Sequence, residues 1–314
     1  EKPASGIIAG HPMIDELVVV KKDGWFKNPG VNFKTARRLS KKGYDVVIDF
    51  QGILKSAIWV KLIKSGRKIG FSNAREMSHL FLTEKLPAYD PEMHAVDRYM
   101  LLARYALGDA RFDTVDFALS IDERAKGSIR DTLNGLGVGS DFVVLLPGAR
   151  WKTKLWTTKG FASLAVMIKE KLSLDVVLAG SEADKHLTGE IIEYAGASAV
   201  DMAGHTTLNE LTALLSLAGF IVTVDSGPMH IASAIGKPVI ALFGATAPGR
   251  TGPYGKDNII IESELDCSPC FKRECAEPNC MELVSAEQVM KAILNAPFVA
   301  KSGLEGKRLK AELS

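Results

Sequence analysis

The strongest constraint on the fold is a set of short, almost wholly apolar segments in the second half of the chain. Residues 142–146 read F-V-V-L-L, residues 220–224 read F-I-V-T-V, and residues 239–243 read V-I-A-L-F. Each has the length of a strand and is rich in β-branched or aromatic residues, which predicts strands buried on both faces. Residues 174–179 and 199–202 are predicted to add two more strands. Because helical stretches separate these segments, the pattern indicates βαβ units and a parallel sheet.

The first half of the chain shows a similar alternation. Strands are predicted at residues 17–20, 45–50 and 68–71, and helices are predicted at residues 33–42, 53–63 and 95–107. The same reasoning therefore predicts a second set of βαβ units in this half, and the chain as a whole is expected to be an α/β protein.

The organisation into domains follows from length and from one change in composition. The chain of 314 residues is long enough for about two domains, and residues 108–140 are more polar and only weakly periodic. We predict an N-terminal domain over residues 1–125, a second domain over residues 140–284, and a closing helix with a tail over residues 285–314. Residues 1–10 resemble the end of a helix, which indicates that an N-terminal piece precedes this chain.

The charge is unevenly distributed although the formal net charge is only +2. Eleven Lys or Arg residues lie between Lys27 and Lys68, against the two acids Asp45 and Asp49. This stretch suits an anionic ligand or a membrane surface, and equally a solvated helix face. The longest apolar stretch, residues 211–224, is too short to span a membrane and contains Ser and Gly. With no signal peptide visible and no dispersed cysteines, a cytoplasmic location is expected.

The junction between one predicted strand and the next helix is the first candidate site. Residues 222–230 read V-T-V-D-S-G-P-M-H, so the strand ends at Asp225 and a helix begins after Ser226, with Gly227 in its first turn. The free N–H groups of such a helix start bind anions in α/β proteins, and His230 lies within one turn of them. The alternative is an ordinary strand-to-helix turn with a capping serine.

Other loops should meet the same edge of the predicted sheet, because each follows a strand. Lys154 is positioned to neutralise a phosphate, and Glu182 to accept hydrogen bonds from a ribose diol. Separately, each has a plainer interpretation, as a solvated lysine or as the start of a helix. The sequence lacks a P-loop, a G-x-G-x-x-G turn near a first strand and a G-x-S-x-G elbow, which argues against an ATPase, a dehydrogenase and an α/β hydrolase.

All the cysteines of the chain lie in one short segment, C-S-P-C-F-K-R-E-C-A-E-P-N-C. Four thiolates in such a segment are able to bind zinc, although the spacing is not that of a standard finger. Disulfides and free thiols in a surface loop are the alternatives. The candidate ligands are Cys267, Cys270, Cys275 and Cys280.

Several motifs together resemble glycosyltransferase family 9, the bacterial ADP-heptose transferases of lipopolysaccharide synthesis. In the second half they are P-G-A-R-W-K-T-K-L-W (147–156), A-G-S-E (179–182), V-D-S-G-P-M-H-I-A-S-A (224–234) and G-A-T-A-P…G-P-Y-G (244–255). In the first half they are D-F-Q-G-I-L-K-S-A (49–57), G-F-S-N-A-R-E (70–76) and H-A-V-D-R-Y (94–99). The first-half motifs look most like the heptosyltransferase I branch, which acts on the 3-deoxy-manno-octulosonic acid unit of lipid A precursors.

The resemblance implies a GT-B architecture, in which two Rossmann-like domains face each other across a cleft. It implies roles for Lys154 and Asp225 in catalysis. The donor-binding residues that it implies are Lys154 for phosphate, Glu182 for ribose, Thr206 for adenine, and Asp225, Ser226, Gly227 and His230 for the diphosphate and sugar. The acceptor-binding residues that it implies are Gln51, Lys55, Arg75, His94 and Arg98.

One part of the family pattern is not found in residues 1–20. The family opens with a first strand and a glycine-rich turn that carries an Asp, its proposed general base. We therefore expect that this first strand and the base belong to the segment that precedes the chain.

The implied reaction is inverting transfer of heptose from ADP-heptose to the inner core, 3-deoxy-manno-octulosonic acid–lipid A, with no cofactor required. The acceptor is a lipid, so peripheral contact with the inner face of the inner membrane is expected, whereas no motif indicates nucleic-acid binding. The alternatives are another sugar or acceptor within the family, a sugar-nucleotide epimerase of similar fold, and a nucleotide-sugar-binding protein without turnover.

Overall fold

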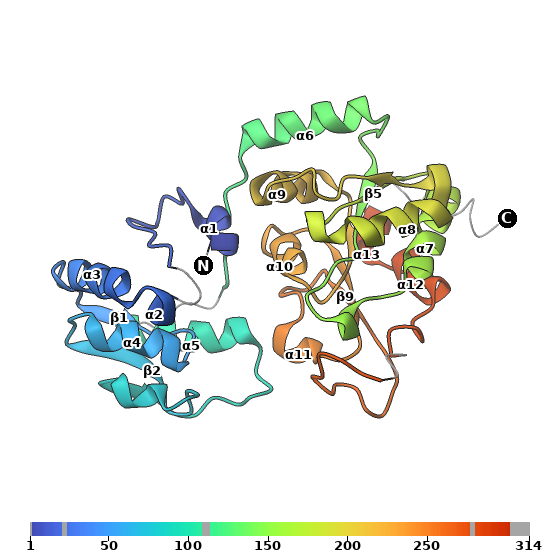
Figure 1. The fold of residues 1–314 in the computed structure, drawn as a ribbon. Helices are drawn as coiled ribbons and strands as arrows, with labels where there is room; N and C mark the ends of the chain where they lie inside the picture. Colours follow the sequence, from blue (N-terminus) through green and yellow to red (C-terminus); the bar gives the residue numbers. More distant parts are fainter. Residues whose placement is uncertain (1, 21–23, 109–113, 277–279, 302–314) are drawn as a thin grey trace. The chain divides into compact units, whose positions relative to one another are not determined.

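The computed structural model describes residues 2–20, 24–108, 114–276 and 280–301. The chain divides into two compact units, unit 1 (Glu1–Asp116) and unit 2 (Phe117–Ser314). Each unit combines a parallel sheet with helices (Figure 1).

Unit 2 contains a six-stranded parallel sheet in the order β6-β5-β4-β7-β8-β9. Its strands are β4 (Phe142–Leu146), β5 (Asp175–Leu178), β6 (Val200–Asp201), β7 (Ile221–Val224), β8 (Val239–Phe243) and β9 (Ile259–Glu262). The chain builds outward from β4 in one direction and then returns to build outward from β7 in the other. This is the Rossmann order, and it places a topological switch point between β4 and β7.

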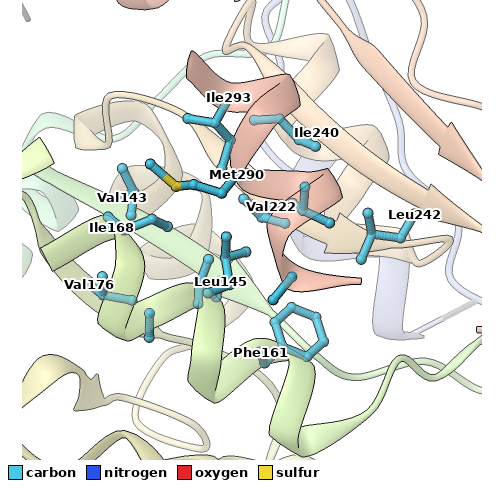
Figure 2. Packing of buried hydrophobic residues seen from close by; sticks show 14 of the residues in the cluster. Val143, Leu145, Phe161, Ile168, Val176, Val222, Ile240, Leu242, Met290 and Ile293 are labelled. Carbon is cyan, nitrogen blue, oxygen red and sulfur yellow. The ribbon is translucent and has the colours of Figure 1, made fainter. Parts of the chain in front are cut away.

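The sheet of unit 2 is buried because its strands carry apolar side chains on both faces. Alternate residues of β4, such as Val143 and Leu145, pack on α7 (Thr158–Leu172) and α12 (Ala286–Leu294). Figure 2 shows strand residues of this cluster lying against Phe161 and Ile168 of α7 and Met290 and Ile293 of α12. The remaining helices of unit 2 are α6 (Glu123–Gly135), η2 (Lys152–Lys154), η3 (Glu182–Asp184), α8 (Lys185–Ala195), η4 (Gly196–Ser198), α9 (Leu208–Leu217), α10 (Gly227–Ala234), α11 (Pro248–Thr251) and α13 (Pro297–Lys301).

Unit 1 contains a three-stranded parallel sheet in the order β1-β2-β3. Its core joins Ile69 and Phe71 of β2 and Leu86 of β3 to Leu102 and Ala106 of α5. The elements of unit 1 are α1 (Lys2–Ile8), α2 (Gly24–Lys27), α3 (Pro29–Ser40), β1 (Val46–Ile48), α4 (Leu54–Leu62), β2 (Arg67–Phe71), η1 (Ser78–Phe81), β3 (Glu84–Leu86) and α5 (Ala95–Leu107).

The predicted α/β class and the Rossmann-like sheets are confirmed, while individual elements differ from the prediction. Residues 17–20 are not a strand, because the described residues offer them no partner strand to pair with. The elements β3, β9 and α6 were not predicted from the sequence, and the polar stretch expected to link the domains contains α6. In the parts of the chain that the structure describes, no helix is long and apolar enough to cross a membrane.

Candidate functional site

A pocket of about 740 Å³ lies at the carboxyl edge of the unit 2 sheet, where the loops after β4, β5, β6 and β7 meet. This edge includes the switch point between β4 and β7, which is where ligands bind in Rossmann-type sheets. The structure brings six of the predicted donor residues into the lining of this pocket: Lys154, Thr206, Asp225, Ser226, Gly227 and His230.

A largely buried ion pair joins two of these loops. Nζ of Lys154, which ends the short helix η2, lies 2.6 Å from Oδ2 of Asp225, which follows β7 directly. The Asp225 side chain is only 7% exposed and the Lys154 side chain 17% exposed. Removing Lys154 would leave the charge of the buried Asp225 carboxylate without its cationic partner. The pair sets a cation and an anion at fixed positions in the pocket wall.

The start of α10 opens into the same pocket. Ser226 occupies the N-cap position, but its side chain makes no capping hydrogen bond, which corrects the expectation of a capping serine. Its Oγ lies 3.3 Å from Oγ1 of Thr223 instead. A Cβ built on Gly227 would meet no atom within 4 Å, so neither packing nor a positive φ requires glycine there. The helix start therefore leaves space and N–H donors for an anion.

The loop after β4 supplies an aromatic residue to which the sequence analysis assigned no role. Trp151 lines the pocket, and Nζ of Lys154 lies 4.5 Å from the centroid of its ring. Cζ of Arg273 lies 5.2 Å from the same centroid. A cation near an aromatic ring is attracted to its π-electrons, so Trp151 helps to hold the Lys154 ammonium in place.

The predicted ribose ligand, Glu182, does not line the pocket, although both of its neighbours in sequence do. Its side chain is 75% exposed and pairs with Nζ of Lys185 at 2.9 Å. The acid that does line this part of the pocket is Asp184, which accepts hydrogen bonds of 2.7 Å from both N and Oγ of Ser181. Asp184 fills the space beside Gly148, where a Cβ would come within 2.4 Å of its carboxyl group.

Thr206 and the first turn of α9 form another wall of the pocket. This turn begins with a capping box, in which Glu210 Oε2 accepts hydrogen bonds of 2.8 Å from N and Oγ1 of Thr207. These hydrogen bonds hold the pKa of the Glu210 carboxyl below its ordinary value. The pattern T-x-x-E at 207–210 was the available signal for this helix start.

In unit 1, three of the predicted acceptor residues lie on loops that leave the carboxyl ends of β1 and β2. Gln51 follows β1, Lys55 lies in the first turn of α4, and Arg75 follows β2. The backbone N–H of Arg75 donates to the carbonyl of Gly52 at 2.9 Å, which ties the two loops together. Asp49 anchors the β1 loop by accepting a hydrogen bond from the backbone N–H of Gln51 at 3.1 Å.

The other two predicted acceptor residues lie at the start of α5, after β3. Nδ1 of His94 caps the helix by accepting a hydrogen bond of 3.2 Å from the backbone N–H of Val96. Cζ of Arg98 lies 4.7 Å from the ring centroid of Tyr89. The carbonyl of Tyr89 accepts a hydrogen bond of 3.0 Å from the Asn73 amide, which links this loop to the loop after β2. The structure thus gathers all five predicted residues on one edge of the unit 1 sheet.

The four-cysteine segment follows β9 and contains four free thiols. Among the described residues, no three or more His, Cys, Asp or Glu side chains are arranged to hold a metal ion. Cys267 and Cys275 are exposed, and burial raises the pKa of the Cys280 thiol. Backbone and side-chain groups of the segment form hydrogen bonds with the loop after β8. The arrangement gives no support to a zinc site.

Comparison with known proteins agrees with this geometry. The family model described as glycosyltransferase family 9 (heptosyltransferase) matches residues 32–281. The chain is 30% identical to lipopolysaccharide heptosyltransferase 1 of Pseudomonas aeruginosa over 284 residues, which are 88% of this chain and 77% of the relative. It is 28% identical to the lipopolysaccharide core heptosyltransferase OpsX of Haemophilus influenzae, over 96% of this chain and 85% of the relative.

Solved structures share the fold. A family 9 glycosyltransferase from Veillonella parvula superimposes with a TM-score of 0.81 at 23% identity, covering 99% of this chain and 87% of that one. The E. coli heptosyltransferase WaaC with ADP superimposes with a TM-score of 0.72 at 24% identity, covering 93% of this chain and 87% of that one. The family model matches most of the chain, and the relatives and the Rossmann-like sheets agree with that match. The chain therefore belongs to glycosyltransferase family 9 and is a glycosyltransferase.

Proposed function

We propose that this enzyme transfers heptose from ADP-heptose to the 3-deoxy-manno-octulosonic acid unit of a lipid A precursor, with inversion at the anomeric carbon. The observation that carries the proposal is the largely buried Lys154–Asp225 pair beside the open start of α10, in a pocket at the Rossmann switch point. Relatives at 26–30% identity are named lipopolysaccharide heptosyltransferase 1, and WaaC has been solved with ADP-2-deoxy-2-fluoro heptose.

The donor belongs in the pocket of unit 2. In this proposal the Lys154 ammonium and the N–H groups at the start of α10 hold the diphosphate. Negative charge grows on the diphosphate as the bond to the sugar breaks, and donors already in place stabilise that charge most effectively. Asp225 and His230 face the sugar end, and Thr206 presents its backbone to the adenine. Glu182 serves the ribose at the pocket rim, after exchanging its contact with Lys185.

The acceptor belongs on the carboxyl edge of the unit 1 sheet. Lys55, Arg75 and Arg98 offer cationic groups there, and Gln51 and His94 offer polar ones. An acceptor that carries phosphates and carboxylates would form charge-assisted hydrogen bonds with such groups. The lipid part of the acceptor lies in a bilayer, so we propose that the enzyme works in the cytoplasm at the inner face of the inner membrane.

The reaction itself is a substitution at one carbon. An acceptor hydroxyl attacks the anomeric carbon from the side opposite ADP, a new C–O bond forms, and the bond to the diphosphate oxygen breaks. A general base accepts the proton of the attacking hydroxyl, a step typically worth about 10²- to 10⁴-fold in rate. ADP leaves with the electron pair, stabilised by Lys154 and α10.

A transfer assay with ADP-heptose and a defined lipid A precursor tests the proposal, using the full-length protein. We expect one heptose on the acceptor and one ADP released per turnover, with inverted configuration by NMR. An altered donor sugar formed without acceptor would indicate an epimerase instead. ADP binding by calorimetry without any transfer would indicate a binding protein and would refute the proposal.

A further inference from the structure

Asp225 has a second partner in the pocket wall that belongs to a different loop. Thr246 lies in the loop after β8, and its Oγ1 donates a hydrogen bond of 2.7 Å to Oδ2 of Asp225. Both residues are buried, with 5% of Thr246 and 7% of Asp225 exposed. Thr246 does not line the pocket, so any influence it has on a bound ligand passes through Asp225.

The same carboxylate oxygen receives both contacts. Oδ2 of Asp225 lies 2.6 Å from Nζ of Lys154 and accepts the Thr246 hydroxyl proton. Two donors on one oxygen fix the rotation of the carboxylate about its bond to the chain. The two donors differ, because in the proposed function Lys154 also binds the donor diphosphate. When its ammonium turns towards a donor phosphate, the Thr246 hydroxyl keeps the carboxylate in the same orientation.

The four-cysteine segment forms hydrogen bonds with the loop that carries Thr246. The backbone N–H of Phe271 donates to the carbonyl of Ala245 at 2.7 Å, and Oγ of Ser268 donates to the carbonyl of Gly244. A Cβ on Gly244 would come within 2.9 Å of Sγ of Cys280, so the segment packs closely on this loop. The position of the Thr246 hydroxyl is therefore set by backbone contacts on both of the preceding residues.

We propose that Thr246 is a positioning residue for the transfer reaction, which orients the Asp225 carboxylate towards the sugar end of the donor. The inference rests on the proposed function. A carboxylate gains nothing from a diphosphate, but it stabilises the positive charge that develops on the sugar as its bond to ADP breaks. A misdirected Asp225 would therefore slow the chemical step more than it would weaken the binding of ADP.

Two matched variants separate the hydroxyl from the methyl group of the side chain. Thr246→Val keeps the shape and removes the hydrogen bond, and we expect kcat to fall about 10- to 30-fold while the Kd of ADP changes less than about threefold. Thr246→Ser keeps the hydroxyl, and we expect kcat within about threefold of the wild type. Should Thr246→Val fail to fold by circular dichroism, Thr246→Ala takes its place with the same expectation.

A double-mutant cycle shows whether the effect passes through Asp225. In single-turnover assays, Thr246→Val added to Asp225→Ala should slow transfer by no more than about twofold beyond Asp225→Ala alone, because the acceptor of the Thr246 hydrogen bond is already absent. Three results would each overturn the positioning role and leave the proposed function intact. They are additive losses in the cycle, equal losses in the Val and Ser variants, and a Val variant as active as the wild type. A wild-type enzyme that transfers no heptose would overturn the proposed function and this inference with it.

Discussion

The carboxyl edges of the two sheets differ in how they hold their polar groups. In unit 2, the partly buried Lys154 and the buried Asp225 form an ion pair in a pocket of about 740 Å³. In unit 1, Gln51 and Arg75 are exposed, and the loops are joined through backbone hydrogen bonds. Unit 1 also exposes the large apolar side chains Phe50, Leu54 and Met77 in the segments that follow β1 and β2. The contrast indicates a preorganised site for a small, highly charged ligand in one unit and an open surface for an extended ligand in the other.

The largest effect is expected from removing the partly buried Lys154 ammonium. Lys154→Ala should lower turnover at least about 100-fold, because one preorganised donor to a developing charge is worth that much. The loss should also appear as weaker ADP binding, measured by calorimetry. Lys154→Arg keeps the charge but not the geometry, so it should recover only part of the activity.

The matched control for Lys154 is another lysine of the same unit. Lys159 also lies over an aromatic ring, with Nζ 5.5 Å from the centroid of Tyr194, but it does not line the donor pocket. Lys159→Ala should leave turnover unchanged. Equal losses in the Lys154 and Lys159 variants, or unchanged kinetics in Lys154→Ala, would remove Lys154 from the site.

The second prediction concerns the space at the start of α10. Gly227→Ala places a methyl group where the protein has no atom within 4 Å, so only a bound ligand should meet it. We expect ADP to bind roughly 30-fold more weakly, the equivalent of about 2 kcal/mol of overpacking, with an unchanged free energy of unfolding. Gly189→Ala is the control, because this helical glycine of α8 also has open space around it and lies outside the pocket. It should stabilise the fold by about 0.5–1 kcal/mol and leave ADP binding unchanged.

Fully buried strands were easier to predict from the sequence than short strands at the sides of the sheets. Strands such as β4 and β8 are continuous apolar runs that only a sheet covered on both faces accommodates. The strand β3 reads E-K-L, which carries no such signal, and its place is set by pairing with β2. The opposite error arose at residues 17–20, where an apolar run has no partner strand among the described residues. Strand propensity reports suitability for a sheet, not the presence of a neighbour.

For the site, the sequence indicated which loops meet but not which side chains point inward. Parallel strands bring their following loops to one edge, so Lys154 and Asp225 were predictable as neighbours. The roles of Thr246 and Asp184 depend on side-chain contacts between loops that are distant in sequence. The same limit applies to Glu182, because its neighbours Ser181 and Ala183 line the pocket while its own side chain pairs with Lys185 and does not.

The third prediction tests the open edge of unit 1. Cζ of Arg98 lies 4.7 Å from the ring centroid of Tyr89, and its Nε is buried without a hydrogen-bond partner among the described residues. We propose that this guanidinium contacts an anionic group of the acceptor. Arg98→Ala should raise the acceptor KM about tenfold through loss of a charge-assisted hydrogen bond, with the donor KM unchanged. Lys64→Ala is the control, because Lys64 lies in the loop before β2, at the opposite edge of the same sheet. Equal effects of the two variants would show that unit 1 attracts the acceptor only through its general basic charge.

The smallest expected effect is a change in the stability of unit 2 that leaves ADP binding unchanged. Asp175 begins β5 at the edge opposite the pocket, where it accepts hydrogen bonds from Lys169 at 2.6 Å and from the backbone N–H of Gly139 at 2.7 Å. The hydrogen bond from Lys169 is the main cause that holds the pKa of this carboxyl below 3.8. Solvent screens the pair, because the Lys169 side chain is 46% exposed, so Asp175→Asn should lower the free energy of unfolding by only about 1 kcal/mol.

The sign of the pH dependence follows from the depressed pKa of Asp175. The folded protein favours the ionised carboxylate, so this stabilisation is present above the unfolded value of 3.8 and is lost as the pH falls through the lower folded pKa. Urea unfolding at a series of pH values should show a constant difference between the wild type and Asp175→Asn near neutrality, and a shrinking difference below pH 3.8. ADP affinity should be the same in both proteins. A variant that lost ADP binding together with stability would mean that the two edges of the unit 2 sheet are coupled, and that the charges at the pocket are not held by their local contacts alone.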